Sequence, residues 1–277
     1  MHYVEANGVR LRYTVTGNGP PVLLIQGVGV VGEGWRPQID GLEDRFTLIA
    51  FDNRGIGGST MPDGTLTIPD MASDAFVLMS ALGFERFHAA GHSMGGLIAQ
   101  EMALRQPARI MSLALLCTFA HGRQGAKPSL GMLPTAIRTR IGTRAMRRNA
   151  FLELVMPREY LQKSNRAQLA ERLRPLFGRD LANQPPIVMK QLRAMAKFDA
   201  GDRLHQLGSI PTLVIAASED RIARPVFGRE LAKAIPGAVY VELPNAGHGV
   251  TIHRASDVNE LLSAHLARAE ALLPQVV

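Results

Sequence analysis

The chain alternates between short apolar runs and longer segments with helical spacing of apolar residues. Two segments with strand-like alternation, 2–6 and 9–16, flank Asn7-Gly8 and predict a β-hairpin. Continuous apolar runs predict buried strands at 22–26, 47–52, 87–90, 110–117, 212–217 and 239–243. Helical spacing predicts helices over 68–82, 94–105 and 255–273. Strands that alternate with helices in this way are typical of an α/β protein with a mostly parallel sheet of eight strands.

The middle of the chain breaks this alternation. Residues 122–205 contain no convincing strand pattern, and prolines interrupt their helical stretches. We therefore predict a helical cap at 122–205, inserted between the sixth and seventh strands. Residues 1–121 and 206–277 would then form the α/β core.

Composition excludes several classes of protein. The chain has 277 residues, 46% of them hydrophobic and 20% charged, which is typical of a globular domain. No apolar stretch reaches the ~18 residues of a membrane span, and residues 1–17 lack a signal-peptide pattern. Cys117 is the single cysteine, so an intrachain disulfide is impossible. We expect a cytoplasmic protein, either a monomer or a homodimer, with no membrane span.

Charge is distributed unevenly. The net charge is +7, whereas residues 122–204 alone hold 17 Lys and Arg against 6 Asp and Glu. This basic surface could attract acidic partners, although a solvated helical surface is the simpler interpretation. Zinc-ligand spacing, arginine runs and basic–aromatic RNA motifs are missing from the sequence, so we expect no nucleic-acid partner.

Two glycine-rich motifs suggest different chemistry. Residues 27–32, GVGVVG, match the G-x-G-x-x-G pattern of dinucleotide-binding loops, and Asp52 follows at the position of a ribose-binding acid. A dinucleotide loop, however, opens directly into a helix, and residues 33–37 are a poor helix start. The second motif, GHSMGG at 91–96, is G-x-S-x-G between a predicted strand and a predicted helix, which is the setting of a nucleophilic serine.

A serine nucleophile needs a base, and the base needs a carboxylate that orients it. Downstream of Ser93, a strand leads into a loop with Glu219 and Asp220, and another leads into a loop with His248. The order Ser, acid, His is the one expected for this kind of turn. We expect His92, beside the serine, to be structural because adjacent residues of the turn point apart.

These motifs together resemble the α/β-hydrolase superfamily, with matches along nearly the whole chain: QGVG, DNRGIGGS, GHSMGG, SEDRIARP and NAGHG. The resemblance implies Ser93 as nucleophile, His248 as base and Asp220 as acid. Asp220 precedes Pro225 by five positions, one more than the usual D-x-x-x-P, so Glu219 stays an alternative. The serine argues against relatives that use an aspartate nucleophile.

The resemblance also assigns the glycine loop a different role from nucleotide binding. At this position the family usually has His-Gly-x, in which the third residue donates its backbone N–H to the oxyanion. Here Gln26-Gly27 stands instead of His-Gly, and Val28 inherits the donor role beside the N–H of Met94. We expect no metal and no organic cofactor.

The expected reaction is hydrolysis of a carboxylic ester or lactone of a small to medium apolar substrate. Two alternatives stay open: carbon–carbon bond hydrolysis or perhydrolysis with the same triad, and a receptor that binds without turnover. We expect Trp35, Phe119 and Val250 to contact the substrate. Apolar residues of the cap could join them or could be ordinary core: Leu130, Met132, Leu133, Met146, Leu152, Val155, Met156, Met189 and Met195.

Overall fold

A computed structural model describes residues 2–61, 63–126 and 130–272. Its centre is one sheet of eight strands in the order β1-β2-β4-β3-β5-β6-β7-β8. The strands are β1 (His2–Ala6), β2 (Val9–Thr16), β3 (Pro21–Ile25), β4 (Thr47–Phe51), β5 (Phe87–His92), β6 (Ile110–Leu116), β7 (Thr212–Ala217) and β8 (Val239–Leu243). β2 runs antiparallel to both β1 and β4, and the pairs from β4 to β8 are parallel.

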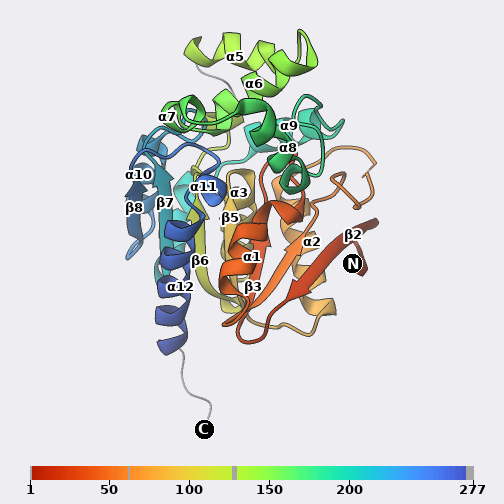
Figure 1. The fold of residues 1–277 in the computed structure, drawn as a ribbon. Coiled ribbons are helices and arrows are strands. Elements are labelled where there is room, and N and C mark those ends of the chain that lie inside the picture. The colour runs from red at the N-terminus through yellow and green to blue at the C-terminus, as the bar shows by residue number, and fades with distance from the viewer. Residues whose placement is uncertain (1, 62, 127–129, 273–277) are drawn as a thin grey trace.

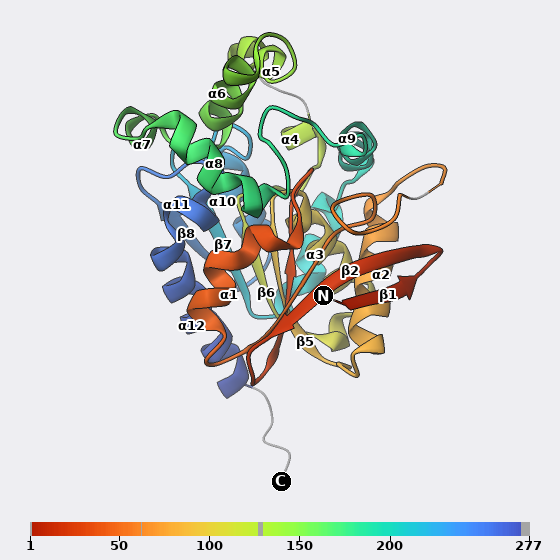
Figure 2. The same cartoon turned by 45° about the vertical axis from the view of Figure 1, so that its right-hand side comes forward.

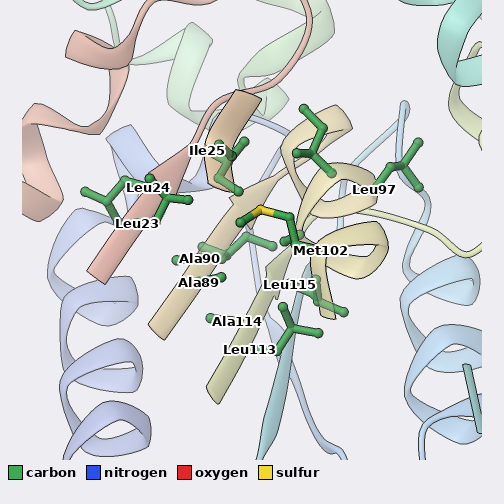
Figure 3. Close-up of a cluster of buried hydrophobic side chains, with 14 of the residues drawn as sticks. Leu23, Leu24, Ile25, Ala89, Ala90, Leu97, Met102, Leu113, Ala114 and Leu115 are labelled. Atoms are coloured by element: carbon green, nitrogen blue, oxygen red, sulfur yellow. The ribbon is translucent and has the colours of Figure 1, made fainter. Parts of the chain in front are cut away.

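The inner strands are largely apolar because both of their faces are covered. Every residue of β5, β6 and β7 is buried. Figure 3 shows part of this core, in which side chains of three adjacent strands pack against Leu97 and Met102 of α3 (Met94–Arg105). The same packing fixes where the parallel strands end, and therefore where the loops after them lie.

Helices cover both faces of the sheet (Figures 1 and 2). α1 (Arg36–Leu42) and α12 (Ala255–Ala271) pack together on one face, with α11 (Val250–His253) beside them. α2 (Ile68–Ala81), α3 and α10 (Pro225–Ala234) cover the other face. Within the described residues, no helix is both long enough and apolar enough to cross a bilayer.

Further helices lie between β6 and β7 in the chain and stand above the sheet in both views (Figures 1 and 2). They are α4 (Arg123–Ala126), η3 (Leu130–Met132), α5 (Leu133–Arg138), α6 (Arg144–Val155), α7 (Arg158–Gln162), α8 (Arg166–Phe177) and α9 (Val188–Lys197). η4 (Gly201–Ser209) follows them in the chain and packs against α3 and α10. Leu152 and Leu173 belong to a small core of their own. The division into core and cap at 122–205 stays a prediction.

One local prediction was wrong. Residues 33–37 do lead into helical structure: the 3-10 turn η1 (Gly32–Trp35) continues directly into α1. Pro37 is tolerated because it lies in the first turn, where backbone N–H groups have no helical partner. An ion pair between Glu33 and Arg36 spans the junction.

Candidate active site

Ser93 occupies a strained turn between β5 and α3. Its φ of 56° and ψ of −119° are sparsely populated by residues with a side chain, and such strain costs about 1–3 kcal/mol. The surrounding structure holds the turn, since the Ser93 N–H donates to the Leu116 carbonyl at 2.9 Å. The Thr118 hydroxyl donates to the Ser93 carbonyl at 2.7 Å. Strain that is held this firmly is typical of a functional residue.

The glycines on either side of Ser93 are required by close backbone approach. A Cβ on Gly91 would overlap the Gly95 carbonyl, and a Cβ on Gly95 would overlap the Ile25 carbonyl. The G-x-S-x-G pattern therefore lets β5, α3 and the end of β3 meet around the serine.

His248 and Asp220 form a buried pair. His248 Nδ1 lies 2.7 Å from Asp220 Oδ2, and only 7% and 3% of the two residues is exposed. Asp220 Oδ1 accepts from the backbone N–H groups of Ile222 and Ala223 at 2.7 and 2.8 Å. The carboxylate is thus fully hydrogen-bonded in an orientation that holds the imidazole. Glu219, the sequence alternative, is exposed and lines a different hollow of the surface.

His92 supports this pair in a way that its position in the sequence did not reveal. Its Nε2 lies 2.8 Å from the His248 carbonyl oxygen, and the two rings are 4.8 Å apart. Burial lowers the pKa of His92 to about 3, so the neutral ring donates Nε2–H to that carbonyl. The bond fixes the backbone from which the His248 side chain projects.

Cys117, directly after β6, lies close to the same pair. Burial raises the pKa of its thiol, and the Asp220 carboxylate adds to this shift. The potential metal-binding donor atoms of Cys117, His92 and His248 all lie within 4.8 Å of one another. A metal ion held by all three would compete with the hydrogen bonds of both histidines.

The loop after β3 approaches Ser93 closely. A Cβ on Gly27 would lie 3.5 Å from Ser93 Oγ. Gln26 is buried, and its side-chain oxygen accepts from the Gly27 N–H at 3.2 Å. Asp52 accepts from the backbone N–H groups of Gly32 and Gly58 at 2.8 and 2.9 Å. This loop therefore lies over the serine, and Asp52 anchors it from behind.

Two neighbouring cavities share lining residues, and Ser93 lines one of them. The inner cavity, about 130 Å³, is lined by Ser93 and His248 and otherwise mostly by apolar side chains. The outer cavity, about 850 Å³, is lined largely by residues from the helices between β6 and β7. Val28, Phe151 and Ile222 line both cavities, which are therefore adjacent.

The cavity walls differ from the sequence-based candidates. Trp35, Phe119 and Val250 are fully buried in the core and are not among the residues that line these two cavities. Of the apolar candidates, Met132, Leu133 and Met189 line the outer cavity and Val155 lines the inner one. The sequence missed Phe151, Phe177 and Ile222, because helical spacing does not distinguish a cavity-facing residue from a core residue. Among the remaining apolar candidates from the sequence, three are buried, namely Leu152, Met156 and Met195, and Met146 is exposed. The side chain of Leu130 lies outside the described residues.

Known proteins match the chain over most of its length. The family model described as the alpha/beta hydrolase fold matches residues 20–254. A relative named "Putative carbamate hydrolase RutD", from Azorhizobium caulinodans, is 30% identical over 262 residues, which is 95% of this chain and 97% of the relative. The enol-lactonase of Burkholderia xenovorans is 30% identical with a TM-score of 0.81, covering 96% of this chain and 100% of the other. A thermophilic esterase of Thermogutta terrifontis, in a structure with malate bound, is 26% identical with a TM-score of 0.80, over 97% and 99% of the chains. The fold, the strained serine turn and these matches agree: the chain belongs to the α/β-hydrolase family.

Proposed function

We propose that this protein is a serine hydrolase that cleaves a carboxylic ester or lactone through an acyl-enzyme on Ser93. The observation that carries the proposal is that His248 lines the same cavity as Ser93 while its Nδ1 lies 2.7 Å from Asp220 Oδ2. A serine hydroxyl, a histidine and a carboxylate in this relation are the elements of acyl transfer.

In the first half of the reaction, Ser93 Oγ attacks the carbonyl carbon of the ester while His248 Nε2 accepts the hydroxyl proton. Asp220 holds Nδ1–H and stabilises the imidazolium that forms. The negative charge that develops on the carbonyl oxygen is stabilised by the backbone N–H groups of Val28 and Met94. The Met94 N–H lies at the start of α3, where the helix dipole favours an anion. His248 then protonates the departing alcohol.

In the second half, water replaces the alcohol. His248 accepts a proton from the water as its oxygen attacks the acyl carbon of the Ser93 ester. The tetrahedral intermediate collapses, the Ser93 oxygen regains a proton from His248, and the carboxylic acid leaves. Both halves use the same oxyanion donors, so no further group is needed.

The cavities support a medium-sized, largely apolar substrate. The inner cavity accommodates the reacting group, and the outer cavity of about 850 Å³ lies within the usual range for small-molecule sites. Phe151, Phe177 and Val155 make the inner wall apolar. Such a wall keeps bulk water away from the reacting carbonyl and so strengthens the oxyanion contacts.

Carbamate hydrolysis is a second candidate, favoured by the name of the relative from Azorhizobium caulinodans. Ser93 would attack the carbonyl carbon in the same way, but in a carbamate that carbon is bonded to nitrogen where an ester has the carbon of its acyl chain. Phenyl N-methylcarbamate and phenyl acetate share a leaving group, so their relative kcat/KM separates the two activities.

The direct test is a panel of phenyl esters of increasing acyl length, together with lactones, assayed with the wild-type protein and with Ser93→Ala. We expect hydrolysis of the esters to fall by at least about 10³-fold in Ser93→Ala, since only the oxyanion donors and binding remain. Full activity in Ser93→Ala would contradict the proposal. Ser218→Ala is a matched control, because Ser218 is exposed in the loop after β7.

A further inference from the structure

The outer cavity has a strongly one-sided charge. Four arginines line it: Arg140, Arg179, Arg221 and Arg224. Among the described residues, its walls contain no Asp or Glu, and none of the four guanidinium groups has a carboxylate oxygen within 4.0 Å. A surface whose charges are of one sign attracts ligands of the opposite sign.

Carboxylate partners are nevertheless available to arginines of this region. Elsewhere on the same helices, arginines are paired: Arg148 with Asp180 at 2.7 Å, and Arg166 with Glu153 at 2.9 Å. Asp180 directly follows Arg179, yet its two oxygens are occupied by Arg144 and Arg148. The one carboxylate beside Arg179 in the sequence is therefore engaged by other cations.

Arg179 is the one of the four that is only partly exposed, whereas the other three are exposed. Its Nε is buried without a hydrogen-bond partner, while Nη1 donates to the Asn183 carbonyl at 2.8 Å. The guanidinium packs over the rings of Phe151 and Phe177, with Cζ 5.3 and 5.9 Å from their centroids. Burial lowers the pKa of Arg179 to about 10, so the group remains protonated near neutral pH at a cost in hydration.

The position of Arg179 connects it to the reaction. Phe151 and Phe177 line the inner cavity with Ser93. Nη2 lies 3.6 Å from where a Cβ on Gly29 would be, next to the loop that carries Val28. A charged N–H such as that of Nη2 donates a strong hydrogen bond to a carboxylate.

From this arrangement we propose that Arg179 binds a free carboxylate of the substrate, so that the preferred ester or lactone is an anion. This inference rests on the proposed hydrolysis and deepens it by naming the substrate class. The carboxylate would compensate for the hydration that the guanidinium of Arg179 loses on burial. The apolar part of the substrate would contact Phe151 and Phe177. The three exposed arginines would add long-range attraction that salt screens.

The test compares esters that differ in one charge. Phenyl hexanoate is neutral, monophenyl adipate has a carboxylate on the acyl chain, and 4-carboxyphenyl hexanoate has it on the leaving group. We expect one of the two anionic esters to exceed phenyl hexanoate in kcat/KM by about 10- to 100-fold, the range for a hydrogen bond to a charged group. Equal kcat/KM for all three esters would overturn the inference.

Three variants assign the preference to Arg179. Arg179→Gln should bring the ratio of anionic to neutral kcat/KM close to one, and Arg179→Lys should restore part of it through its charge. Arg174→Gln removes the same charge from an exposed position of α8 outside both cavities and should keep the wild-type ratio. An unchanged ratio in Arg179→Gln, including an equal loss on all esters, would contradict the assignment.

Binding separates this inference from the proposed chemistry. Calorimetry on Ser93→Ala with monophenyl adipate, 4-carboxyphenyl hexanoate and phenyl hexanoate measures recognition without turnover. Tighter binding of an anionic ester than of the neutral one, lost in Ser93→Ala/Arg179→Gln, supports the carboxylate site even if the wild-type protein hydrolyses none of them. Hydrolysis of all three esters without preference would support Ser93 chemistry and refute the site at Arg179.

Discussion

Asp220→Asn gives the sharpest prediction for the proposed roles of His248 and Asp220, because the structure fixes the orientation of the carboxylate. Oδ1 accepts from the two backbone N–H groups of Ile222 and Ala223, and Oδ2 faces His248 Nδ1. In the variant, the amide oxygen should stay with the backbone donors, and the NH₂ group should then face Nδ1. His248 Nδ1 would become an acceptor, which places the ring proton on Nε2.

A histidine protonated at Nε2 cannot accept the proton of Ser93. We therefore expect kcat to fall by about 10⁴-fold, or about 5 kcal/mol in the barrier, with little change in KM. Asparagine is nearly isosteric with aspartate, so packing should change little. Loss of the buried carboxylate as a hydrogen-bond acceptor should still lower the free energy of unfolding by about 1–3 kcal/mol. The assay is hydrolysis of phenyl acetate near pH 7.5, with the melting temperature measured in parallel.

Glu219→Gln is the matched control. It makes the same chemical change one residue away, at an exposed side chain, and should alter kcat by less than about twofold. The reasoning would be refuted if Glu219→Gln lost activity while Asp220→Asn kept it. It would also be refuted if Asp220→Asn lost activity only in proportion to unfolded protein.

Three further predictions concern the framework of the site. Gly95→Ala should lower the free energy of unfolding by about 1–3 kcal/mol and abolish ester hydrolysis, because the added Cβ would overlap the Ile25 carbonyl. Urea titrations measure the change in stability, and Gly131→Ala is the control because open space surrounds Gly131. Folding lowers the pKa of His92 from 6.5 to about 3, so as the pH falls the unfolded chain takes up this proton at a higher pH than the folded protein. The free energy of unfolding should therefore decrease by up to about 1.4 kcal/mol per pH unit below pH 6.5. In His92→Gln this slope should be shallower in denaturant titrations at pH 4–7, and an unchanged slope would show that other groups, such as His265, dominate. Leu152→Ala, fully buried above the sheet, should cost about 2–5 kcal/mol in unfolding by denaturant, whereas Ile141→Ala, 67% exposed, should cost less than about 0.5.

The sheet could be predicted from the sequence because burial on both faces demands continuous apolar runs. The hairpin around Asn7-Gly8 is confirmed in register, with Ala6 opposite Val9. The apolar run at 212–217 matches β7, and the run at 110–117 extends one residue beyond β6. The helical start at 33–37 was missed because Pro37 is unfavourable within a helix but harmless in its first turn.

The candidate site could be predicted only as far as loops follow parallel strands. The position of Ser93, Asp220 and His248 after β5, β7 and β8 places them at one edge of the sheet. The sequence left Glu219 and Asp220 as alternatives, since neighbouring residues in a loop point in directions that only the turn geometry decides. The cavity walls and the environment of Arg179 were beyond the sequence, because they depend on how separate helices pack against one another.

The central claim is that Ser93 forms a covalent acyl-enzyme, and trapping that intermediate tests it most directly. Phenyl hexanoate is mixed with the protein, the reaction is quenched in acid within its first turnovers, and the digest is mapped by mass spectrometry. We predict a hexanoyl group on the peptide that contains Ser93 and none on that peptide in Ser93→Ala. Rapid ester hydrolysis with acyl modification on another residue, or with unchanged turnover in Ser93→Ala, would contradict the account.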